Sequence, residues 1–401
     1  MINFDFHKYM KEYIKKEDKI IYLDKAKDLK ERFVSGDLSY WNKLDTFISK
    51  KELIKLINLT DFIKENCDVF LVIGIGGSYM GSKAVIEALS PKYAEKKPEI
   101  IFLGTNLTAE EYHETINYLE DKKVIVNVIS KSGTTLEPSI AFSLVMEMME
   151  KKYSSDELKN RIIITTDPED GDLRKLVNEK DFLSFTIPKN VGGRFSVLTP
   201  VGLLPISVAG INVAKILDGA RESFGKIDRA IEYAVIRDIM YHKHKHVESF
   251  TVYNNKLYYF TEWLKQLFAE TQGKDSKGIL PISCVNTRDL HSLGQFFQDG
   301  SDIIFETVIG IDKDFRISLD QYDIELNNLN KIALDKVALA HSNGHTPSNI
   351  ITIDEKNEHA IGELIQFFIL SSIAGAILLE VNPFNQPGVQ DYKDLINNEL
   401  K

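Results

Sequence analysis

A short segment with the sequence SKSGTT, residues 130–135, carries a concentrated array of hydrogen-bond donors. Four hydroxyls and one ammonium follow the apolar run 124–129, which is typical of a buried strand, and precede an expected helix. Hydroxyl groups and free N–H groups at a helix N-terminus suit the oxygens of a phosphomonoester. A simple helix cap would use only one of these residues. We therefore interpret this donor loop, residues 130–135, as a site for the phosphate of a phosphomonoester.

A glycine turn, GIGGS at residues 74–78, follows the expected strand 69–75. A dinucleotide fingerprint would need glycine at position 79, which is Tyr79, and the Gly-Lys-Ser/Thr ending of a Walker motif is absent. What remains is a tight turn before a helix, where free N–H groups and the Ser78 hydroxyl hold one phosphate. A glycine turn needed only for strand–helix packing is the alternative.

A second glycine turn has the sequence GGRFS at residues 192–196. Its paired glycines, including Gly193, allow a ligand to approach the backbone, and Arg194 places a permanent cation there. The alternative is a turn with an exposed arginine. Nothing local decides between the two, although the apolar sequence downstream suggests that Arg194 is anchored near the core.

Two residues are candidates for acid–base chemistry. Glu270 follows the expected helix 257–268 and precedes a glycine that stops the helix. There the helix dipole and partial burial would both raise the pKa of a carboxylate, as a general base near neutral pH requires. His291 stands at an expected helix start and could act as a proton shuttle. Solvated or structural roles are the commoner alternatives for both residues.

Metal and cysteine chemistry are not indicated. The tract HKHKH at residues 242–246 has no carboxylate or cysteine beside it, which favours a solvated, basic helix end over a metal site. Cys67 and Cys284 are far apart and form no CxxC motif, so neither a disulfide framework nor a zinc knuckle is expected. We expect no metal.

These candidate residues must be positioned by an α/β fold. Buried apolar runs alternate with amphipathic stretches, which indicates βαβ units and mostly parallel sheets, and ligands bind at the carboxyl ends of such strands. We expect a helical N-terminal extension (1–50), two α/β domains (51–200 and 201–380) and a C-terminal segment (381–401). The expected strands are 69–75, 100–103, 124–129, 162–165, 250–253, 279–283 and 303–309, and the expected helices include 80–89, 136–152 and 257–268.

Charge and hydropathy narrow the class of protein. The 401 residues carry a net charge of −10, which disfavours nucleic acid as a partner. The N-terminus has charged residues where a signal peptide would be apolar. We interpret the uncharged runs 195–214 and 367–379 as buried core, because prolines interrupt the first and the second is short for a membrane span. A soluble, cytoplasmic protein that does not contact a membrane is expected.

Together the motifs resemble the phosphoglucose isomerase family, from about residue 40 to Lys393. They occur in family order: GIGGS (74–78), SKSGTT (130–135), GGRFSVLTPVG (192–202), AETQGK (269–274), the His291 segment and NQPGVQDYK (385–393). The resemblance implies two αβα sandwich domains of the sugar-isomerase (SIS) type, a homodimer and no cofactor. It also implies reversible conversion of glucose 6-phosphate to fructose 6-phosphate through ring opening and a cis-enediol(ate).

The resemblance also implies roles for individual residues. Gly193 and Arg194 would lie beside C1 and C2, and Glu270 would be the base. The phosphate would be held by Ser78, Ser130, Lys131, Ser132 and Thr135. His291, supplied by the partner subunit, and Lys393 would open the sugar ring; Gln386 would complete the polar lining, with Glu137 a candidate partner for His291. Gln390 stands where the family usually has glutamate, which removes a carboxylate near Lys393 and could shift its pKa or anchoring.

Two alternatives remain open. SIS domains also occur in regulators that sense sugar phosphates without turnover, although those generally lack the glutamate, histidine and lysine set. The same enediol chemistry would also permit an isomerase for another phosphosugar, such as mannose 6-phosphate.

Overall fold

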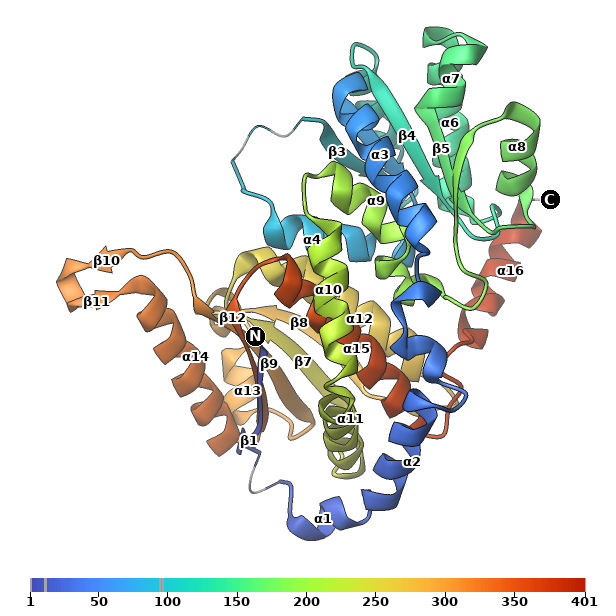
Figure 1. The fold of residues 1–401 in the computed structure, drawn as a ribbon. Helices are drawn as coiled ribbons and strands as arrows, with labels where there is room; N and C mark the ends of the chain where they lie inside the picture. Colours follow the sequence, from blue (N-terminus) through green and yellow to red (C-terminus); the bar gives the residue numbers. More distant parts are fainter. Residues whose placement is uncertain (1, 11–12, 94, 96, 401) are drawn as a thin grey trace. The chain divides into compact units, whose positions relative to one another are not determined.

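A computed structural model describes residues 2–10, 13–93, 95 and 97–400. The chain divides into two compact units. The colours of Figure 1 follow the sequence from the N-terminus to the C-terminus. The inserted unit is Lys43–Leu217, and the discontinuous unit combines Met1–Asn42 with Asp218–Lys401. We expected contiguous domains with boundaries near residues 50, 200 and 380. The division differs because the first 42 residues group with the C-terminal part of the chain.

The inserted unit is built on a five-stranded parallel sheet with the order β3-β2-β4-β5-β6. All residues of β2, β4 and β5 are buried, which explains why their sequences are mostly apolar. The four strands expected here are confirmed to within two residues at each end, whereas β6 was not anticipated. The strands are β2 (Val69–Ile73), β3 (Glu99–Leu103), β4 (Val124–Ile129), β5 (Ile162–Thr166) and β6 (Leu183–Thr186).

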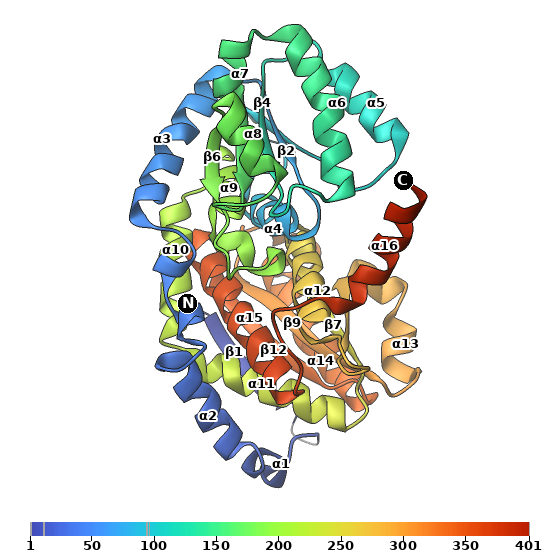
Figure 2. The same ribbon diagram turned by 90° about the vertical axis from the view of Figure 1, so that its right-hand side faces the viewer.

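Helices cover both faces of this sheet (Figure 2). One face packs against α5 (Ala109–Leu119), α6 (Leu136–Lys152), α7 (Ser155–Arg161) and α8 (Asp172–Lys180) in a core of aliphatic side chains. The other is covered by α3 (Lys50–Asn66), α4 (Met80–Leu89) and α9 (Pro200–Val208), and α9 contacts both α3 and α4. Every residue of α9 is buried, so this part of the uncharged run 195–214 is core, as expected.

The discontinuous unit contains a second five-stranded sheet with the order β1-β12-β9-β7-β8. Only β1 is antiparallel to its neighbour. The helical prediction for the N-terminus is wrong for residues 2–9, because the alternating apolar residues Ile2, Phe4 and Phe6 form an edge strand that pairs with β12. The strands are β1 (Ile2–Tyr9), β7 (Val247–Val252), β8 (Leu280–Val285), β9 (Ile304–Lys313) and β12 (Ser348–Glu355).

The faces of the second sheet are also helix-covered. On one side, α11 (Ile227–His242) and α12 (Tyr258–Gln272) contact α15 (Glu358–Leu378), whose Phe367 and Phe368 join a cluster of aromatic rings. On the other lie α13 (Gly294–Asp299) and α14 (Leu326–Asn343). By length and composition α15 could cross a membrane, but 94% of its most apolar window is buried in the protein. Such burial is typical of a core helix.

The remaining elements are shorter or peripheral. A small hairpin joins β10 (Ser318–Leu319) to β11 (Ile324–Glu325), and α16 (Gln390–Glu399) ends the described chain. The segment between β1 and the inserted unit contains α1 (Lys16–Ile20) and α2 (Leu23–Val34), and α10 covers Val213–Phe224.

Candidate active site

The donor loop lies in the inserted unit, between the end of β4 and the start of α6. Gly133 has a φ of +76°, and a Cβ there would lie 2.9 Å from the Leu173 nitrogen, so the turn requires glycine. The Ser130 hydroxyl accepts from the Gly133 N–H at 3.1 Å, and the Ser132 hydroxyl accepts from the Thr134 N–H at 3.2 Å. These bonds fold the loop over the N-terminus of α6.

Thr135 is the N-cap residue of α6, a helix of 17 residues. Within the described chain its hydroxyl makes no capping hydrogen bond, so the simple cap interpretation of this residue does not hold. The Lys131 ammonium donates to the main-chain oxygen of Lys189 at 2.6 Å, which leaves two of its three protons for other acceptors. A cavity of about 400 Å³ borders the loop at Ser130, Gly133 and Thr135. The loop can therefore offer hydroxyl, ammonium and helix N–H donors to an anion.

The two glycine turns of the inserted unit touch each other. A Cβ added to Gly77 would lie 2.1 Å from the carbonyl carbon and oxygen of Gly193, so the backbones meet where glycine alone fits. The Ser196 hydroxyl bonds to the carbonyl oxygens of Gly193 at 2.7 Å and Gly77 at 3.3 Å. Close packing thus accounts for Gly77, and it also brings the Ser78 turn next to the Arg194 turn.

Arg194 is buried, with 2% of its surface exposed, so the alternative of an exposed arginine is excluded. Its guanidinium carbon lies 4.8 Å from the centre of the Phe195 ring. A cation held in this way is weakly hydrated and strongly constrained, which suits the stabilisation of a developing negative charge.

Glu270 lies in the last turn of α12, in the discontinuous unit. The helix continues to Gln272, four residues beyond the expected end, and Gly273 caps it. One oxygen of the partly buried Glu270 carboxylate accepts from Gln266 Nε2 at 3.0 Å, and the other accepts from Gln386 Nε2 at 2.5 Å. Amide donors on both oxygens hold the carboxylate in one orientation.

The segment that carries Gln386 is anchored at several points. The Lys274 ammonium donates to the main-chain oxygen of Asn382, and the Asn382 side chain accepts from the Phe384 N–H at 2.9 Å. The Phe384 ring stacks on Trp41, with the ring centres 5.4 Å apart and the planes within 6°. Sequence reasoning missed Gln266, Trp41 and Phe384. Only Gln266 had a local signal, since it stands four residues before Glu270 on the same helix.

His291 and Lys393 are both exposed. His291 ends the short 3₁₀ turn Arg288–His291 after β8. Arg288 forms two bonds with Asp289, at 2.7 and 2.9 Å, and lowers the pKa of that carboxyl. Lys393 lies on α16, where Gln390 donates to Asp394 at 2.7 Å.

The candidate residues are only partly brought together within each unit. Among the hydrogen bonds found in the described part of the discontinuous unit, Glu270 pairs with Gln386 but not with His291 or Lys393. Glu137 lies in the first turn of α6, in the inserted unit, where the helix dipole favours a carboxylate.

One group in the described chain has the composition of a metal site. Ligand atoms of Glu222, His359 and Glu363 lie within 4.8 Å of one another. The Lys226 ammonium already bonds to Glu222 at 2.8 Å and to Glu363 at 2.5 Å, so a cation occupies the position between the carboxylates. In the histidine tract, His242 Nδ1 bonds to the main-chain oxygen of Asp238 at 2.8 Å. We assign no metal to either group.

Comparisons with known proteins agree with the family resemblance. A family model described as phosphoglucose isomerase matches residues 51–279. The chain is 41% identical to a glucose-6-phosphate isomerase of Shouchella clausii and 40% identical to one of Caldanaerobacter subterraneus. Each alignment covers 98% of this chain and 94% of the relative.

Solved structures share the fold. A hypothetical protein from Thermus thermophilus superposes with a TM-score of 0.90 at 24% identity, and the whole of both chains is covered. A glucose-6-phosphate isomerase from Chlamydia trachomatis superposes with a TM-score of 0.76 at 22% identity, over 88% of this chain and 73% of that one. At these identities the likeness concerns the fold alone.

Proposed function

The chain belongs to the phosphoglucose isomerase family, and we propose that it interconverts glucose 6-phosphate and fructose 6-phosphate as an intramolecular aldose–ketose isomerase. The observation that carries the proposal is the identity of about 41% to a curated glucose-6-phosphate isomerase over 98% of the chain. This reaction belongs to glycolysis and gluconeogenesis. A phosphosugar substrate agrees with the family and with the donor loop.

The phosphate of the substrate binds to Ser78, Ser130, Lys131, Ser132 and Thr135. The arrangement of the donor loop over the N-terminus of α6 supports this assignment, because N–H groups, hydroxyls and an ammonium lie together there. The protein as a whole carries a net charge of −10, so an anionic substrate needs such a local site. Binding at the phosphate, remote from the reacting carbons, supplies energy for positioning the sugar.

Glu270 is the base that moves a proton between C2 and C1. In the open-chain aldose it takes the C2 proton, the C–H electron pair forms the C1–C2 double bond, and the C1 carbonyl becomes an enediol(ate) oxygen. The C2 hydroxyl proton passes to the C1 oxygen, the carbonyl forms at C2, and the same carboxyl returns the abstracted proton to C1. The amide bonds from Gln266 and Gln386 support this role, because they fix the carboxylate without adding a charge. Gly193 and the Arg194 cation lie beside C1 and C2, where negative charge develops.

His291 and Lys393 open the sugar ring before the proton transfer. Their exposure agrees with residues that complete a site only in a larger assembly. We propose a homodimer in which His291 is supplied to the site of the partner subunit. Glu137 is the proposed hydrogen-bond partner of that histidine. No cofactor takes part in these steps, and we propose a cytoplasmic enzyme that binds neither nucleic acid nor membrane.

The test compares the wild-type protein with Glu270→Gln, a variant of nearly the same shape. We expect the isomerisation rate to fall at least about a hundredfold, because general-base catalysis contributes a factor of this order. A coupled assay with fructose 6-phosphate follows the rate, and calorimetry checks that phosphosugar binding persists. Near-wild-type turnover would refute the base assignment.

The same assay decides between the alternatives. Mannose 6-phosphate is offered in parallel with fructose 6-phosphate to the wild-type protein. Binding of phosphosugars without turnover of either would favour a sensor, and faster turnover of mannose 6-phosphate would favour the other isomerase.

A further inference from the structure

The last turn of α12 ends with a buried glutamine, two residues after Glu270. Gln272 is 1% exposed, and both ends of its side-chain amide are bonded. The amide oxygen accepts from a guanidinium nitrogen of Arg237 on α11, and the amide nitrogen donates to the main-chain oxygen of Ser372 on α15 at 2.9 Å. A Cβ added to Gly375 would lie 2.3 Å from the same amide nitrogen, so α15 has a glycine where the amide packs. The amide therefore joins the end of α12 to two neighbouring helices.

The guanidinium that binds Gln272 is itself fixed. Arg237 Nε donates to the buried carboxylate of Glu248 at 2.7 Å, and the other oxygen of that carboxylate accepts from two buried hydroxyls. The guanidinium carbon lies 4.1 Å from the centre of the Phe268 ring. Phe268 and Gln272 flank Glu270 on α12, so these buried groups hold the helix on both sides of the proposed base.

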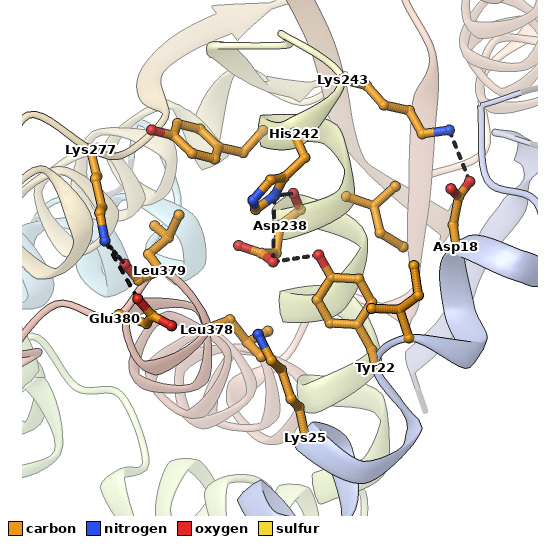
Figure 3. Close-up of a pocket in the computed structure, with 13 residues that line it drawn as sticks. Asp18, Tyr22, Lys25, Asp238, His242, Lys243, Lys277, Leu378, Leu379 and Glu380 are labelled. Carbon is orange, nitrogen blue, oxygen red and sulfur yellow. Dashed lines mark hydrogen bonds and ion pairs between the residues drawn. The ribbon is translucent and has the colours of Figure 1, made fainter.

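The loop that follows α12 is tied to the end of α15. The Lys277 ammonium donates to the main-chain oxygen of Leu379 at 2.9 Å and lies 3.9 Å from a carboxylate oxygen of Glu380 (Figure 3). The segment after α15 carries Gln386, which donates to the Glu270 carboxylate. The helix end that bears the base and the segment that orients its carboxylate are thus attached to each other through this loop.

The end of a helix depends on such contacts, because its last carbonyl groups have no partners within the helix. A terminal turn held only by local bonds opens at little cost in free energy, and its side chains then move. The amides of Gln266 and Gln386 orient the Glu270 carboxylate, but they do not hold the backbone of the turn. Misplacing a catalytic group by about 1 Å can cost about a hundredfold in rate.

We propose that Gln272 is a positioning residue for Glu270, which holds the last turn of α12 so that the carboxylate stays in place for proton transfer between C2 and C1. The inference rests on the isomerase function proposed above. Gln272 itself is buried among three helices and does not contact the substrate. A glutamine with a structural role alone would contribute stability but would leave the rate of proton transfer in the folded protein unchanged.

The test compares the wild-type protein with Gln272→Met, a change that keeps the length of the side chain and removes both amide contacts. The substrate is glucose 6-phosphate with either hydrogen or deuterium at C2, and a coupled assay follows the formation of fructose 6-phosphate. We expect kcat to fall about ten- to a hundredfold while KM stays within about twofold, because the donor loop that binds the phosphate is unchanged. The deuterium isotope effect on kcat should rise, because a misplaced base slows the removal of the C2 proton and no other step.

Thr251→Val is the matched control. Thr251 is fully buried in the same unit, and its hydroxyl donates to Glu306 at 2.9 Å. Glu306 also bonds to His341 of α14, on the face of the sheet opposite α12. Losing a buried hydrogen bond should lower the Tm of both variants by a few degrees. The control should nevertheless keep the wild-type kcat and isotope effect.

Three results would overturn the proposal. One is a Gln272→Met variant whose kcat and isotope effect match those of Thr251→Val, which would leave the glutamine a structural role alone. Another is a rise in KM with kcat unchanged. The third is a wild-type protein that does not turn over the sugar phosphate, which would refute the proposed function and this role with it.

A second variant covers the case in which Gln272→Met does not fold. Arg237→Lys keeps a cation beside Glu248 but lacks the fork of donors that also binds Gln272. We expect it to lower kcat and to raise the isotope effect in the same direction as Gln272→Met. An unchanged isotope effect in this variant would likewise refute the positioning role.

Discussion

Replacing Arg237 with methionine would remove the cation from a buried ion pair beneath the helix that carries Glu270. Arg237 Nε donates to Glu248 at 2.7 Å, and the two side chains are 2% and 0% exposed. The guanidinium also donates to Gln272 in the last turn of α12 and lies 4.1 Å from the centre of the Phe268 ring. The substitution therefore leaves a buried carboxylate without its counter-charge and an amide oxygen without its donor.

The size of the effect follows from this burial. Breaking a buried pair on one side costs about 3–5 kcal/mol, because the remaining charge stays desolvated. The discontinuous unit has roughly 226 residues, and in a unit of that size each kcal/mol lowers the Tm by about 2–4 °C. We therefore expect Arg237→Met to lower the Tm of this unit by about 6–20 °C.

Thermal unfolding followed by circular dichroism at pH 7 would measure the shift. Arg229→Met is the matched control, since Arg229 lies on the same helix in an exposed pair with Glu232 and should change the Tm by only a few degrees. The double variant Arg237→Met/Glu248→Leu should be more stable than the single variant, because no charge stays buried and the Tyr233 and Thr307 hydroxyls, 2.9 Å apart, still bond to each other.

Two outcomes would refute the reasoning. One is a fall in Tm of less than about 2 °C for Arg237→Met, which would mean that the pair contributes no more than an exposed one. The other is a double variant as unstable as the single one, which would place the cost in lost packing around Phe268 rather than in the unpaired charge.

Other predictions concern backbone packing, thiol reactivity and acid stability. Gly77→Ala should destabilise the inserted unit by about 2–3 kcal/mol and lower turnover, because the added Cβ would lie 2.1 Å from the backbone of Gly193. The control Gly388→Ala, with open space around its Cβ, should change neither stability nor turnover. Urea unfolding measures the stability, and the coupled assay measures the turnover. Burial raises the pKa of Cys67 to about 12 and of Cys284 to about 11, so a thiol reagent at pH 8 should label them only after unfolding. Hydrogen bonds from the Lys8 ammonium and the Tyr9 hydroxyl of β1 lower the pKa of Asp335 to about 2 from an ordinary 3.8. Their stabilising effect is complete above the ordinary value and is lost as the pH falls through about 2, so amide exchange in β1 should accelerate in that window, and Asp335→Asn should abolish the pH dependence.

Local patterns predicted most elements of the inserted unit. The helices expected at 80–89 and 136–152 coincide with α4 and α6, and the buried runs became β2 to β5. Such runs are informative because a parallel strand covered by helices on both faces is buried along its length and is therefore mostly apolar. The N-terminal strand was missed because Asp5, His7 and Lys8 interleave with its apolar residues, which made a two-residue period resemble a charged helix.

The candidate site was predictable as a set of residues but not as a set of contacts. The donor loop is contiguous, so the order of strand, hydroxyl-rich loop and helix could be predicted from the sequence. The bond between Glu270 and Gln386 joins positions 116 residues apart. It depends on how Trp41 and Lys274 hold the segment before Gln386, and no local pattern specifies such an arrangement.

The discontinuous unit has a consequence for the order in which the chain folds during synthesis. Strand β1 leaves the ribosome first, but its partner β12 starts at Ser348, so hundreds of residues are made before the two can pair. The inserted unit, by contrast, has all its strands between residues 69 and 186. The inserted unit can therefore fold before β1 has a partner. Until β12 is made, the unpaired segment of β1 is the part of the nascent protein most exposed to aggregation or to binding by a chaperone.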